Sequence, residues 1–277
     1  MSQRAVRAAV LMEGCGSRRF ERALSLVAVR APALPIDPPQ RGRQTDAPMS
    51  DQTASASVPT DLVIDIVSDV VCPWCYIGKR KLETALAELR AREPGLTTIR
   101  RWHPFQLNPD LPEQGVARAA YLEAKFGGKA RAAEIYARVR KAGAEVGIAF
   151  DFERIEHQPN TLDAHRLTAW AQQRGDAAST DALVEALFRA YFIDGRRIGD
   201  HEELVRIAGE AGFPEAETRA LLASEAGRVD VEAEDREARA VGIGGVPFFI
   251  FNGRTAVSGA HDPPALLEAI GAARAAT

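Results

Sequence analysis

The sequence predicts an α/β protein in which two strand-containing segments are separated by a large all-helical insertion. Short β-branched or aromatic runs cluster between residues 62 and 102 and return after Gly242. Between Gly115 and Gly242 the chain is rich in alanine and charge, and its apolar residues recur at helical spacing. With 277 residues, of which 46% are hydrophobic, the chain can bury a substantial core.

The first strand-containing segment has the pattern of a βαβ unit. The run Leu62–Val67 predicts a strand, and the weaker run Leu96–Trp102 predicts a second strand that ends at His103-Pro104. Pro94-Gly95 ends the helix expected between them. The predicted inner face of this helix carries apolar residues at helical spacing, at Leu82, Ala85, Leu86 and Leu89.

The insertion has the pattern of five to seven helices with almost no strand signal. One apolar face comprises Ile135, Val139, Ala142 and Val146, and another comprises Leu183, Val184, Leu187, Phe188 and Tyr191. Asp200 and Glu203 have the spacing of a capping box, which predicts the start of a further helix.

After Gly242 the pattern predicts two strands and a helix. The run Val246–Phe251 is apolar on both faces, Asn252-Gly253 is typical of a tight hairpin turn, and Thr255–Ser258 supplies the partner strand. Asp262, followed by two prolines, predicts the start of a last helix. The residues expected to face inward are Ala265, Leu266, Ala269 and Ile270.

These patterns divide the chain into one domain formed by residues 59–110 and 243–275, an inserted helical subdomain at 111–242, and a disordered leader at 1–58. The first 48 residues hold eight arginines, four acidic residues and no lysine, and they lack the continuous apolar core of an export signal. Met49 opens a polar stretch shortly before the first strand, so we expect translation to start there. An arginine-rich transit peptide is the alternative.

Composition excludes several classes of partner. The formal net charge is −3, without an apolar stretch of membrane-spanning length or a strongly basic face, so we expect neither a membrane nor a nucleic-acid partner. Three cysteines are too few for a disulfide-stapled secreted scaffold, and Cys15 lies in the leader. The other two cysteines are therefore more consistent with a catalytic role than with a structural one. We expect the protein to be a monomer or a homodimer.

Cys72, Pro73, Trp74 and Cys75 stand where the first predicted helix begins. This spacing allows a disulfide, and the unsatisfied N–H groups at the start of a helix favour a thiolate at Cys72. Pro73 suits the first helical position because its missing N–H would have no partner there. Two alternatives remain: half of a zinc site, for which the five scattered histidines offer no second pair of ligands, and two inert buried thiols.

Four separated motifs extend the pattern beyond the dithiol. They are Ser68–Lys79, Phe105–Pro109, Asn160-Thr161 with Ala164–Arg166, and Gly244–Phe249. Together with the βαβ, helical insertion and ββα order, they resemble the thioredoxin-like fold of the DsbA family, and its FrnE-like branch in particular. The resemblance covers about residues 62 to 273.

The resemblance implies a role for each residue near the dithiol. Cys72 would be the exposed, attacking thiolate, and Cys75 the more protected, resolving thiol with a higher pKa. Val246 and Pro247 would face the substrate through a cis peptide bond, with Pro73 and Trp74 beside the sulfurs; an ordinary strand-initiating proline is the alternative for Pro247.

Other residues of these motifs have weaker assignments. Three residues would border the site: Asn160, His103 and Trp102. The alternatives are that Asn160 begins a helix, that His103 ends a strand and that Trp102 fills the core. Thioredoxins carry a buried carboxylate where this chain has Ile66, so Asp65 and Asp69 are the nearest candidates for a proton relay.

These roles predict a thiol-disulfide oxidoreductase or isomerase that acts on a disulfide-containing protein or a small thiol, without a bound cofactor. A strongly oxidising relative carries a histidine between its cysteines, and this chain has none, so its thiolate should be less stabilised. We therefore expect a reduction potential between the thioredoxin-like and DsbA-like extremes, roughly −270 to −120 mV. One alternative is a glutathione-dependent isomerase or transferase of the 2-hydroxychromene-2-carboxylate isomerase or kappa type, with glutathione as co-substrate. Another is a redox-sensing or chaperone-like binding protein. We expect a cytoplasmic location, where the dithiol would be mostly reduced.

Overall fold

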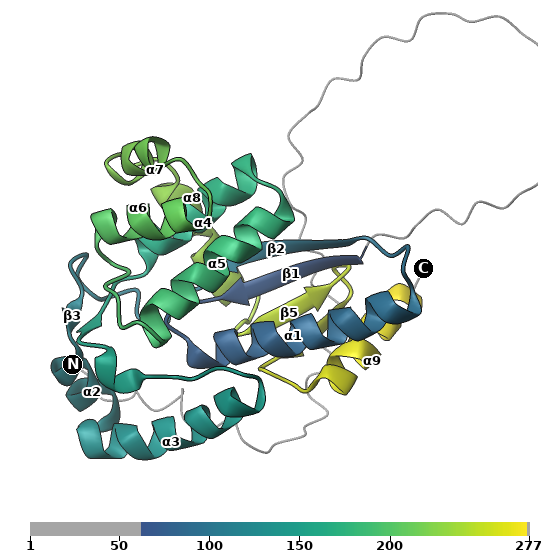
Figure 1. Cartoon of the computed structure of the whole chain (residues 1–277), viewed down its shortest axis with the longest axis horizontal. Coiled ribbons are helices and arrows are strands. Elements are labelled where there is room, and N and C mark those ends of the chain that lie inside the picture. Colours follow the sequence, from purple (N-terminus) through teal and green to yellow (C-terminus); the bar gives the residue numbers. More distant parts are fainter. Residues whose placement is uncertain (1–61, 276–277) are drawn as a thin grey trace, which may run out of the picture.

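A four-stranded sheet organises the computed structural model, which describes residues 62–275 (Figure 1). The strand order is β2 (Thr98–Pro104), β1 (Leu62–Ser68), β5 (Phe248–Phe251) and β6 (Thr255–Ser258). Strands β1 and β2 are parallel, while β5 is antiparallel to both β1 and β6. A parallel pair needs a crossover connection, which helix α1 (Pro73–Arg92) supplies.

Helix α1 and the last helix, α9 (Pro263–Ala275), pack together against one face of the sheet (Figure 1). Alternate residues of β1 point to this face, and Leu62, Ile64 and Ile66 are almost completely buried there. The four predicted inner residues of α1 are buried in the same cluster. The βαβ and ββα units therefore share one core.

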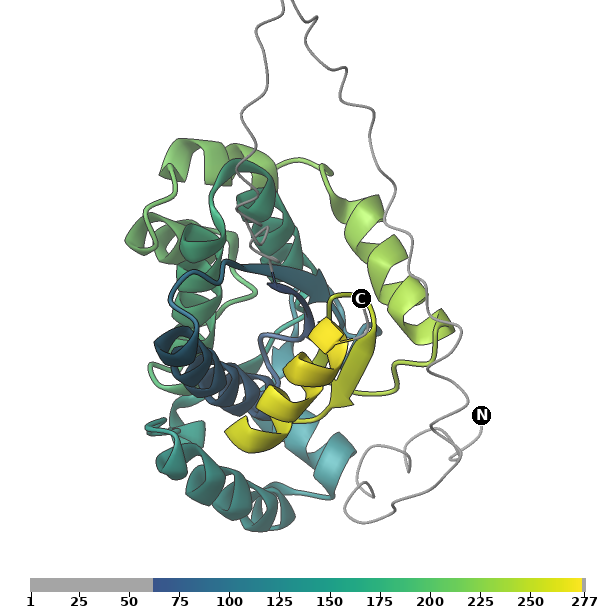
Figure 2. The same cartoon turned by 90° about the vertical axis from the view of Figure 1, so that its right-hand side faces the viewer.

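Helix α8 (Arg228–Ala240) lies on the other side of the sheet, opposite α1 (Figure 2). Beneath it, Val67, Phe105 and Ile243 form a second, smaller hydrophobic cluster, against which Ala238 packs. The last helix of the insertion thus covers the second face of the sheet.

The remaining helices of the insertion lie around the ends of β1 and β2 (Figure 1). They are α2 (Arg118–Phe126), α3 (Lys129–Glu145), α4 (Leu162–Arg174), α5 (Ala177–Phe192), α6 (His201–Glu210) and α7 (Glu215–Leu222). With α8 the described insertion has seven helices, within the predicted range. The sequence did not predict the short antiparallel pair β3 (Val116–Ala117) and β4 (His157–Gln158), because two-residue strands leave no periodicity to detect.

Several boundaries differ from the sequence-based expectations. Strand β2 continues through His103 to Pro104, and β5 begins at Phe248 rather than Val246, since Pro247 has no N–H to donate. In α9, Ala265 is exposed because Leu266, Ala269 and Ile270 already define the buried face.

Two local predictions are confirmed. Asp200 caps α6 by accepting a hydrogen bond from the Glu203 N–H at 3.1 Å. Asn252 and Gly253 have φ values of 50° and 63°, as a tight β-hairpin turn with two left-handed residues requires.

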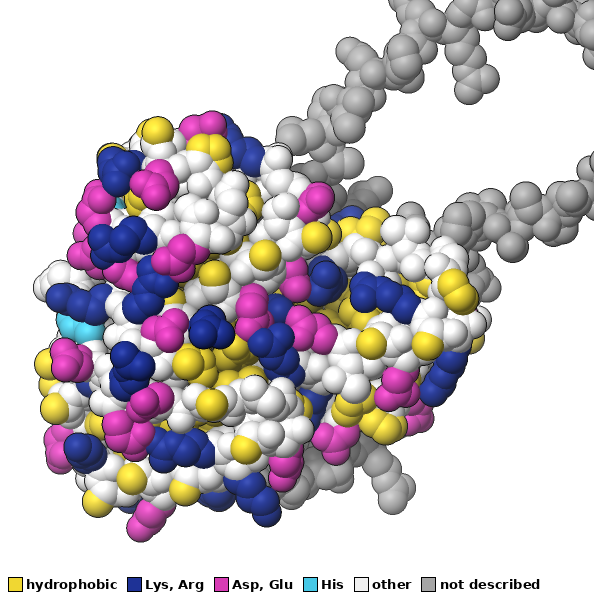
Figure 3. Space-filling view, viewed as in Figure 1, with side chains coloured by type: hydrophobic (Ala, Val, Ile, Leu, Met, Phe, Trp, Pro, Cys, Tyr) yellow, Lys and Arg dark blue, Asp and Glu magenta, His cyan; other side chains and the backbone are white. Residues whose placement is uncertain are grey.

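Charges of both signs are interspersed over the face of the molecule seen in Figure 3, and hydrophobic side chains show between them near its centre. None of the helices between residues 62 and 275 is both long and apolar enough to cross a membrane. The predicted leader, including the expected start at Met49, lies outside the described residues.

Candidate active site

The dithiol lies at the N-terminal end of α1, on the side of the sheet nearest α2 and α3 (Figure 1). Cys72 is the N-cap of α1 and Pro73 its first residue, as the sequence predicts. The Cys72 N–H donates to the Asp69 carbonyl at 3.0 Å, and the Cys75 N–H donates to the Cys72 carbonyl at 3.0 Å. These bonds fix the turn that carries both sulfurs.

Cys72 is less exposed than the sequence analysis expected. Only 4% of it is exposed, and its thiol donates a hydrogen bond to the Val246 carbonyl oxygen at 3.5 Å. The loop before β5, which lies far away in the sequence, covers this sulfur. The Val246-Pro247 peptide bond is cis, as predicted. Trp74 is 40% exposed beside the covered thiol.

Cys75 has the protected environment that the sequence predicts. It is 2% exposed, and burial raises its pKa well above the ordinary value, as do the hydrogen bond and the charge of Cys72. The Ser68 side chain and the Asp69 backbone act in the opposite direction. Both thiols are free, so this is the dithiol form, in which Cys75 holds its proton more tightly than an exposed thiol.

Gly78 gives α1 room to approach the loop that covers Cys72. A Cβ atom at this position would lie 2.9 Å from Pro247 Cγ and 3.1 Å from Phe249 Cζ. Gly78 belongs to the motif Ser68–Lys79, and the sequence alone predicts no role for it. Its function as a spacer depends on a contact with residues distant in the sequence.

The structure separates the two candidate relay carboxylates. Asp69 is completely buried next to the dithiol, where its Oδ2 accepts a hydrogen bond from the Leu107 N–H at 2.8 Å and its Oδ1 lies 3.4 Å from His165 Nε2. Asp65 lies on β1 and accepts from His103. Ile66 faces the core between them. Only Asp69 therefore stands at the dithiol.

His103 is held by two carboxylates on the side of the sheet that faces α8. Its Nε2 lies 3.0 Å from Asp65 Oδ1, and its Nδ1 lies 3.5 Å from Glu234 Oε2. Burial alone would lower the pKa of His103, but the bonds and charges of Asp65 and Glu234 outweigh it and raise the pKa to about 9. With Trp102, which is buried, His103 lines pockets that include neither cysteine.

The side chain of Asn160 is engaged in internal hydrogen bonds. Its Oδ1 accepts from Gln106 Nε2 at 3.1 Å and from the Leu162 N–H at 2.9 Å, while its Nδ2 donates to the Leu111 carbonyl at 2.8 Å. These bonds join the segment after β2 to the start of α4. Substrate contacts by Asn160 and His103 stay predictions.

Helix α2 carries two cations, Arg118 and Lys125, that the site predicted from the sequence does not include. Arg118 is buried, donates to Gln158, to Tyr191 and to Tyr136, and has an Nε without a hydrogen-bond partner. No carboxylate forms an ion pair with Arg118 or Lys125 among the described residues.

Lys125 lies on the same side of α2, and its Nζ donates to Asn108 Oδ1 at 3.0 Å. Burial lowers the pKa of Lys125, and the nearby Arg118 lowers it further, while Asp69 and Cys72 act in the opposite direction. Arg118 and Lys125 are seven residues apart, so they lie on the same face of α2, and both lie over the ring of Tyr121 between them. This spacing is the sequence signal that could have identified the pair. Between residues 62 and 275 no group of three or more histidine, cysteine or acidic side chains is arranged to hold a metal ion.

Comparisons with known proteins agree with this architecture. A family described as the DSBA-like thioredoxin domain matches residues 63–271. A probable DsbA oxidoreductase from Streptomyces coelicolor is 33% identical, with a TM-score of 0.68 over 78% of this chain and 91% of that one.

Two more distant structures share the fold. A 2-hydroxychromene-2-carboxylate isomerase is 16% identical, with a TM-score of 0.56 over 76% of this chain and 95% of that one. The cytosolic disulfide reductase DsbM from Pseudomonas aeruginosa is 20% identical, with a TM-score of 0.50 over 77% and 95%.

Proposed function

The chain belongs to the family of DsbA-like thioredoxin domains, and from this premise we propose that it is a thiol-disulfide oxidoreductase or isomerase acting through Cys72 and Cys75. The observation that carries the proposal is the asymmetry of the two sulfurs. Cys72 begins α1 and meets the Val246 carbonyl, whereas Cys75 is buried one turn further along with a raised pKa. This arrangement suits one attacking and one resolving thiol.

In the first step the Cys72 thiolate attacks one sulfur of a substrate disulfide. A bond forms between Cys72 Sγ and that sulfur, and the second substrate sulfur leaves as a thiolate that takes up a proton. Cys75 then loses its proton and attacks Cys72 Sγ, which forms the Cys72–Cys75 disulfide and releases the first substrate sulfur. Two electrons pass from the dithiol to the substrate.

The positive end of the α1 helix dipole favours the negative charge on Cys72 during the first step. A bound substrate would displace the Cys72 thiol from the Val246 carbonyl. The backbone polar groups of Val246 would then form hydrogen bonds with the substrate backbone. Trp74 would offer the substrate an exposed apolar surface. These contacts suit a disulfide-containing protein or a small thiol, and they require no bound cofactor.

We place this reaction in the cytoplasm, where glutathione and thioredoxin systems keep thiols reduced and where reduction or isomerisation outweighs net oxidation. The fold shared with a cytosolic disulfide reductase is in keeping with that location. A monomer or a homodimer remains our expectation for the assembly.

Reduction of insulin disulfides in the presence of dithiothreitol tests the proposal. The wild-type protein should accelerate the reaction, and Cys72→Ser should abolish the acceleration. Cys75→Ser should instead accumulate a mixed disulfide at Cys72 that intact-mass measurement detects. An acceleration that survives in Cys72→Ser would show that Cys72 is not the attacking group.

A glutathione-dependent isomerase or transferase is the second candidate, because Arg118 and Lys125 have no carboxylate partner near the dithiol among the described residues. A buried cation without a counter-charge is costly unless a ligand compensates it. The carboxylates of glutathione would supply that charge. The fold shared with a 2-hydroxychromene-2-carboxylate isomerase is compatible with this candidate.

Two disulfide substrates separate the role of these cations from the redox chemistry. Lys125→Gln should raise KM for glutathione disulfide by about tenfold, the loss expected for one charge-assisted contact, and should leave KM for uncharged 2-hydroxyethyl disulfide unchanged. Arg90→Gln, on the distant end of α1, is the matched control. Equal changes for both substrates would rule out carboxylate recognition by Lys125.

A further inference from the structure

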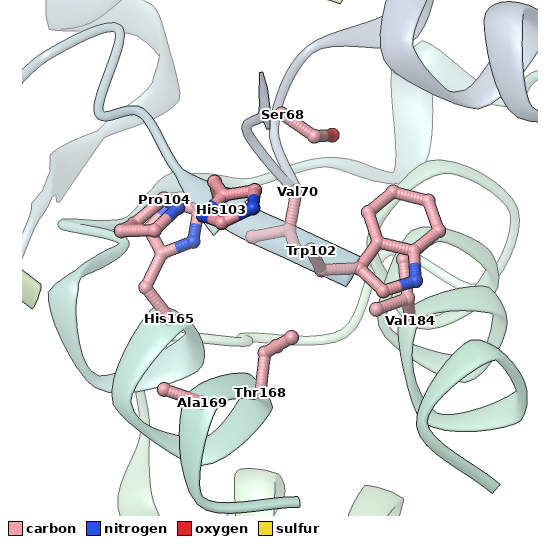
Figure 4. Close-up of a pocket in the computed structure, with 9 residues that line it drawn as sticks. All are labelled: Ser68, Val70, Trp102, His103, Pro104, His165, Thr168, Ala169 and Val184. Carbon is pink, nitrogen blue, oxygen red and sulfur yellow. The ribbon is translucent and has the colours of Figure 1, made fainter. Parts of the chain in front are cut away.

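A small cavity lies between the end of β1, β2, α4 and α5 (Figure 4). Its volume is about 20 Å³, and one water molecule requires about 10–15 Å³. Ser68, Trp102, His103 and His165 contribute polar groups to its lining, among apolar side chains such as Val70 and Val184.

Three buried polar atoms without a hydrogen-bond partner belong to residues that line this cavity: Ser68 Oγ, Trp102 Nε1 and His165 Nε2. Buried polar atoms in folded proteins nearly always have a partner, so their concentration around one cavity requires an explanation. A water molecule in the cavity would supply a partner to those of these atoms that face it, because buried waters typically make two to four hydrogen bonds.

The lining residues connect the cavity to both the dithiol and a base. On one side, the Ser68 side chain is close enough to Cys75 to lower the pKa of that thiol against the larger effect of burial, although Ser68 Oγ completes no hydrogen bond. On the other side, His165 Nε2 lies 3.4 Å from the fully buried Asp69 carboxylate. Asp69 is in turn held by the Leu107 N–H.

We infer that Ser68, a water molecule in this cavity and His165 form the route by which Cys75 loses its proton during the resolving step. This inference rests on the proposed function, since it concerns the attack of Cys75 on the mixed disulfide. The proton leaves Cys75 Sγ, passes through the Ser68 hydroxyl and the water, and arrives at His165 Nε2. The Cys75 thiolate then attacks Cys72 Sγ, and the electron pair of the broken bond leaves with the substrate sulfur.

Asp69 is a positioning residue in this route. Its carboxylate faces His165 Nε2 and stabilises the positive charge that the imidazole gains. The other titratable group that lines the cavity is His103, which is paired with Asp65 and Glu234. This protein has Ile66 where thioredoxins have a buried carboxylate, and in the proposed route His165 takes the place of that carboxylate as the base for Cys75.

An aromatic disulfide that releases a coloured thiolate at each step, 5,5′-dithiobis(2-nitrobenzoate), tests the relay by stopped flow. The reference protein and every variant carry Cys15→Ser, so that Cys72 and Cys75 are the two cysteines that can react. Attack by Cys72 releases the first equivalent at a rate proportional to reagent concentration, and attack by Cys75 releases the second at a rate independent of it. His165→Gln should slow the second release by about 100-fold near pH 7, the contribution typical of a general base, and should leave the first unchanged.

The pH dependence provides a readout that a purely structural role of His165 would not move. In the reference protein the second rate should reach a plateau as the pH rises, and in His165→Gln it should keep rising with hydroxide concentration. Ser68→Ala should also slow only the second release. Thr168→Val, at the same cavity but bonded to the Ala164 carbonyl, is the matched control and should change neither release.

The outcomes separate the relay from the proposed function. A reference protein that releases only one equivalent, or a second equivalent that survives in Cys75→Ser, would contradict the dithiol mechanism itself. Two releases that Cys75→Ser reduces to one, but that His165→Gln and Ser68→Ala leave unchanged, would overturn only the relay. Equal slowing of both releases in His165→Gln would also overturn it, because it would indicate a general distortion of the site.

Discussion

Cys72 and Cys75 are only one helical turn apart, yet their surroundings differ. Cys72 stands at the start of α1, where the positive end of the helix dipole favours negative charge, and its thiol donates to the Val246 carbonyl in a loop that a substrate can displace. Cys75 is enclosed by α1, Ser68 and Asp69, and burial raises its pKa. The first sulfur is thus suited to attack and the second to resolution.

The structure also predicts a measurable charge on His103. Since its pKa is raised to about 9 from an ordinary value of 6.5, its ion pairs contribute stability that is fully present below about pH 6.5 and lost as the pH rises through 9. Solvent screening reduces this contribution to about 1 kcal/mol, because the side chain is more than a third exposed. NMR titration of the His103 ring should give the raised pKa.

His103→Gln should remove the corresponding fall in unfolding free energy between neutral and alkaline pH. The rate of insulin reduction should persist in this variant if His103 has only its ion-pairing role. A His103 pKa near 6.5 in the folded protein would contradict the described pairing with Asp65 and Glu234.

Sequence reasoning identified the residues of the dithiol but not how they are covered. The spacing of Cys72 and Cys75 and the following helical pattern were sufficient to locate the pair, and the resemblance indicated cis Pro247. The burial of Cys72 depends on Val246, which lies 174 positions away. Buried Arg118 was missed because its partners come from β4, α3 and α5.

Among the helices, α1 carries the dithiol and is fixed to its neighbours at two levels. Lys79 is buried and pairs with Glu83 on its own helix and with Asp181 and Glu185 on α5. On the side facing the sheet, Gly78 allows contact with Pro247 and Phe249. The Lys79 ion pairs hold α1 against the insertion, and the small size of Gly78 sets the distance between α1 and the loop over Cys72.

Lys79→Met should lower the free energy of unfolding by about 3 kcal/mol at neutral pH, because three acidic side chains lose a buried cation. Because, against the effect of burial, Lys79 helps to lower the pKa of Glu83, the contribution of this pair to the free energy of unfolding is present above about pH 4.5 and is lost as the pH falls further. The difference in unfolding free energy between wild type and Lys79→Met should therefore narrow in acid. Urea unfolding at several pH values measures both effects.

Arg92→Met, which removes an exposed pair with Glu88 on the same helix, is the control and should cost about 0.5 kcal/mol or less. A loss of similar size in both variants would contradict the role assigned to Lys79.

Gly78→Ala should destabilise the protein by about 1–3 kcal/mol despite the higher helix propensity of alanine, since its Cβ would press on Pro247 and Phe249. It should also slow insulin reduction, because the loop that meets Cys72 would move. Gly271→Ala in α9 is the matched control: nothing lies within 4 Å of its added Cβ, so stability should rise by about 0.5–1 kcal/mol. Thermal unfolding of both variants provides the comparison, and a stabilised Gly78→Ala would refute the close approach.

Elements with long periodic patterns were predictable, and those defined by tertiary pairing were not. The inner face of α1, the Asp200 cap of α6 and the hairpin after β5 followed from local spacing. The extension of β2 to Pro104 and the pair β3–β4 follow from hydrogen bonds to other segments. Local sequence carries little signal for such pairings.

On the scale of the whole molecule, the insertion contributes to the site as well as to the core. Helix α8 covers the second face of the sheet (Figure 2), α4 carries His165 to the cavity that Ser68 also lines (Figure 4), and α2 brings Lys125 toward Cys72. The sheet and α1 position the dithiol, while the helices between β2 and β5 supply the charged and proton-accepting groups around it.

A redox titration of the dithiol tests the central claim most directly. The protein is equilibrated in glutathione or dithiothreitol buffers, free thiols are alkylated, and intact mass gives the fraction oxidised. We predict one two-electron transition between roughly −270 and −120 mV, lost in both Cys72→Ser and Cys75→Ser. A protein whose two thiols stay alkylatable across the whole range, or a transition that survives in either variant, would contradict an exchange reaction at Cys72 and Cys75.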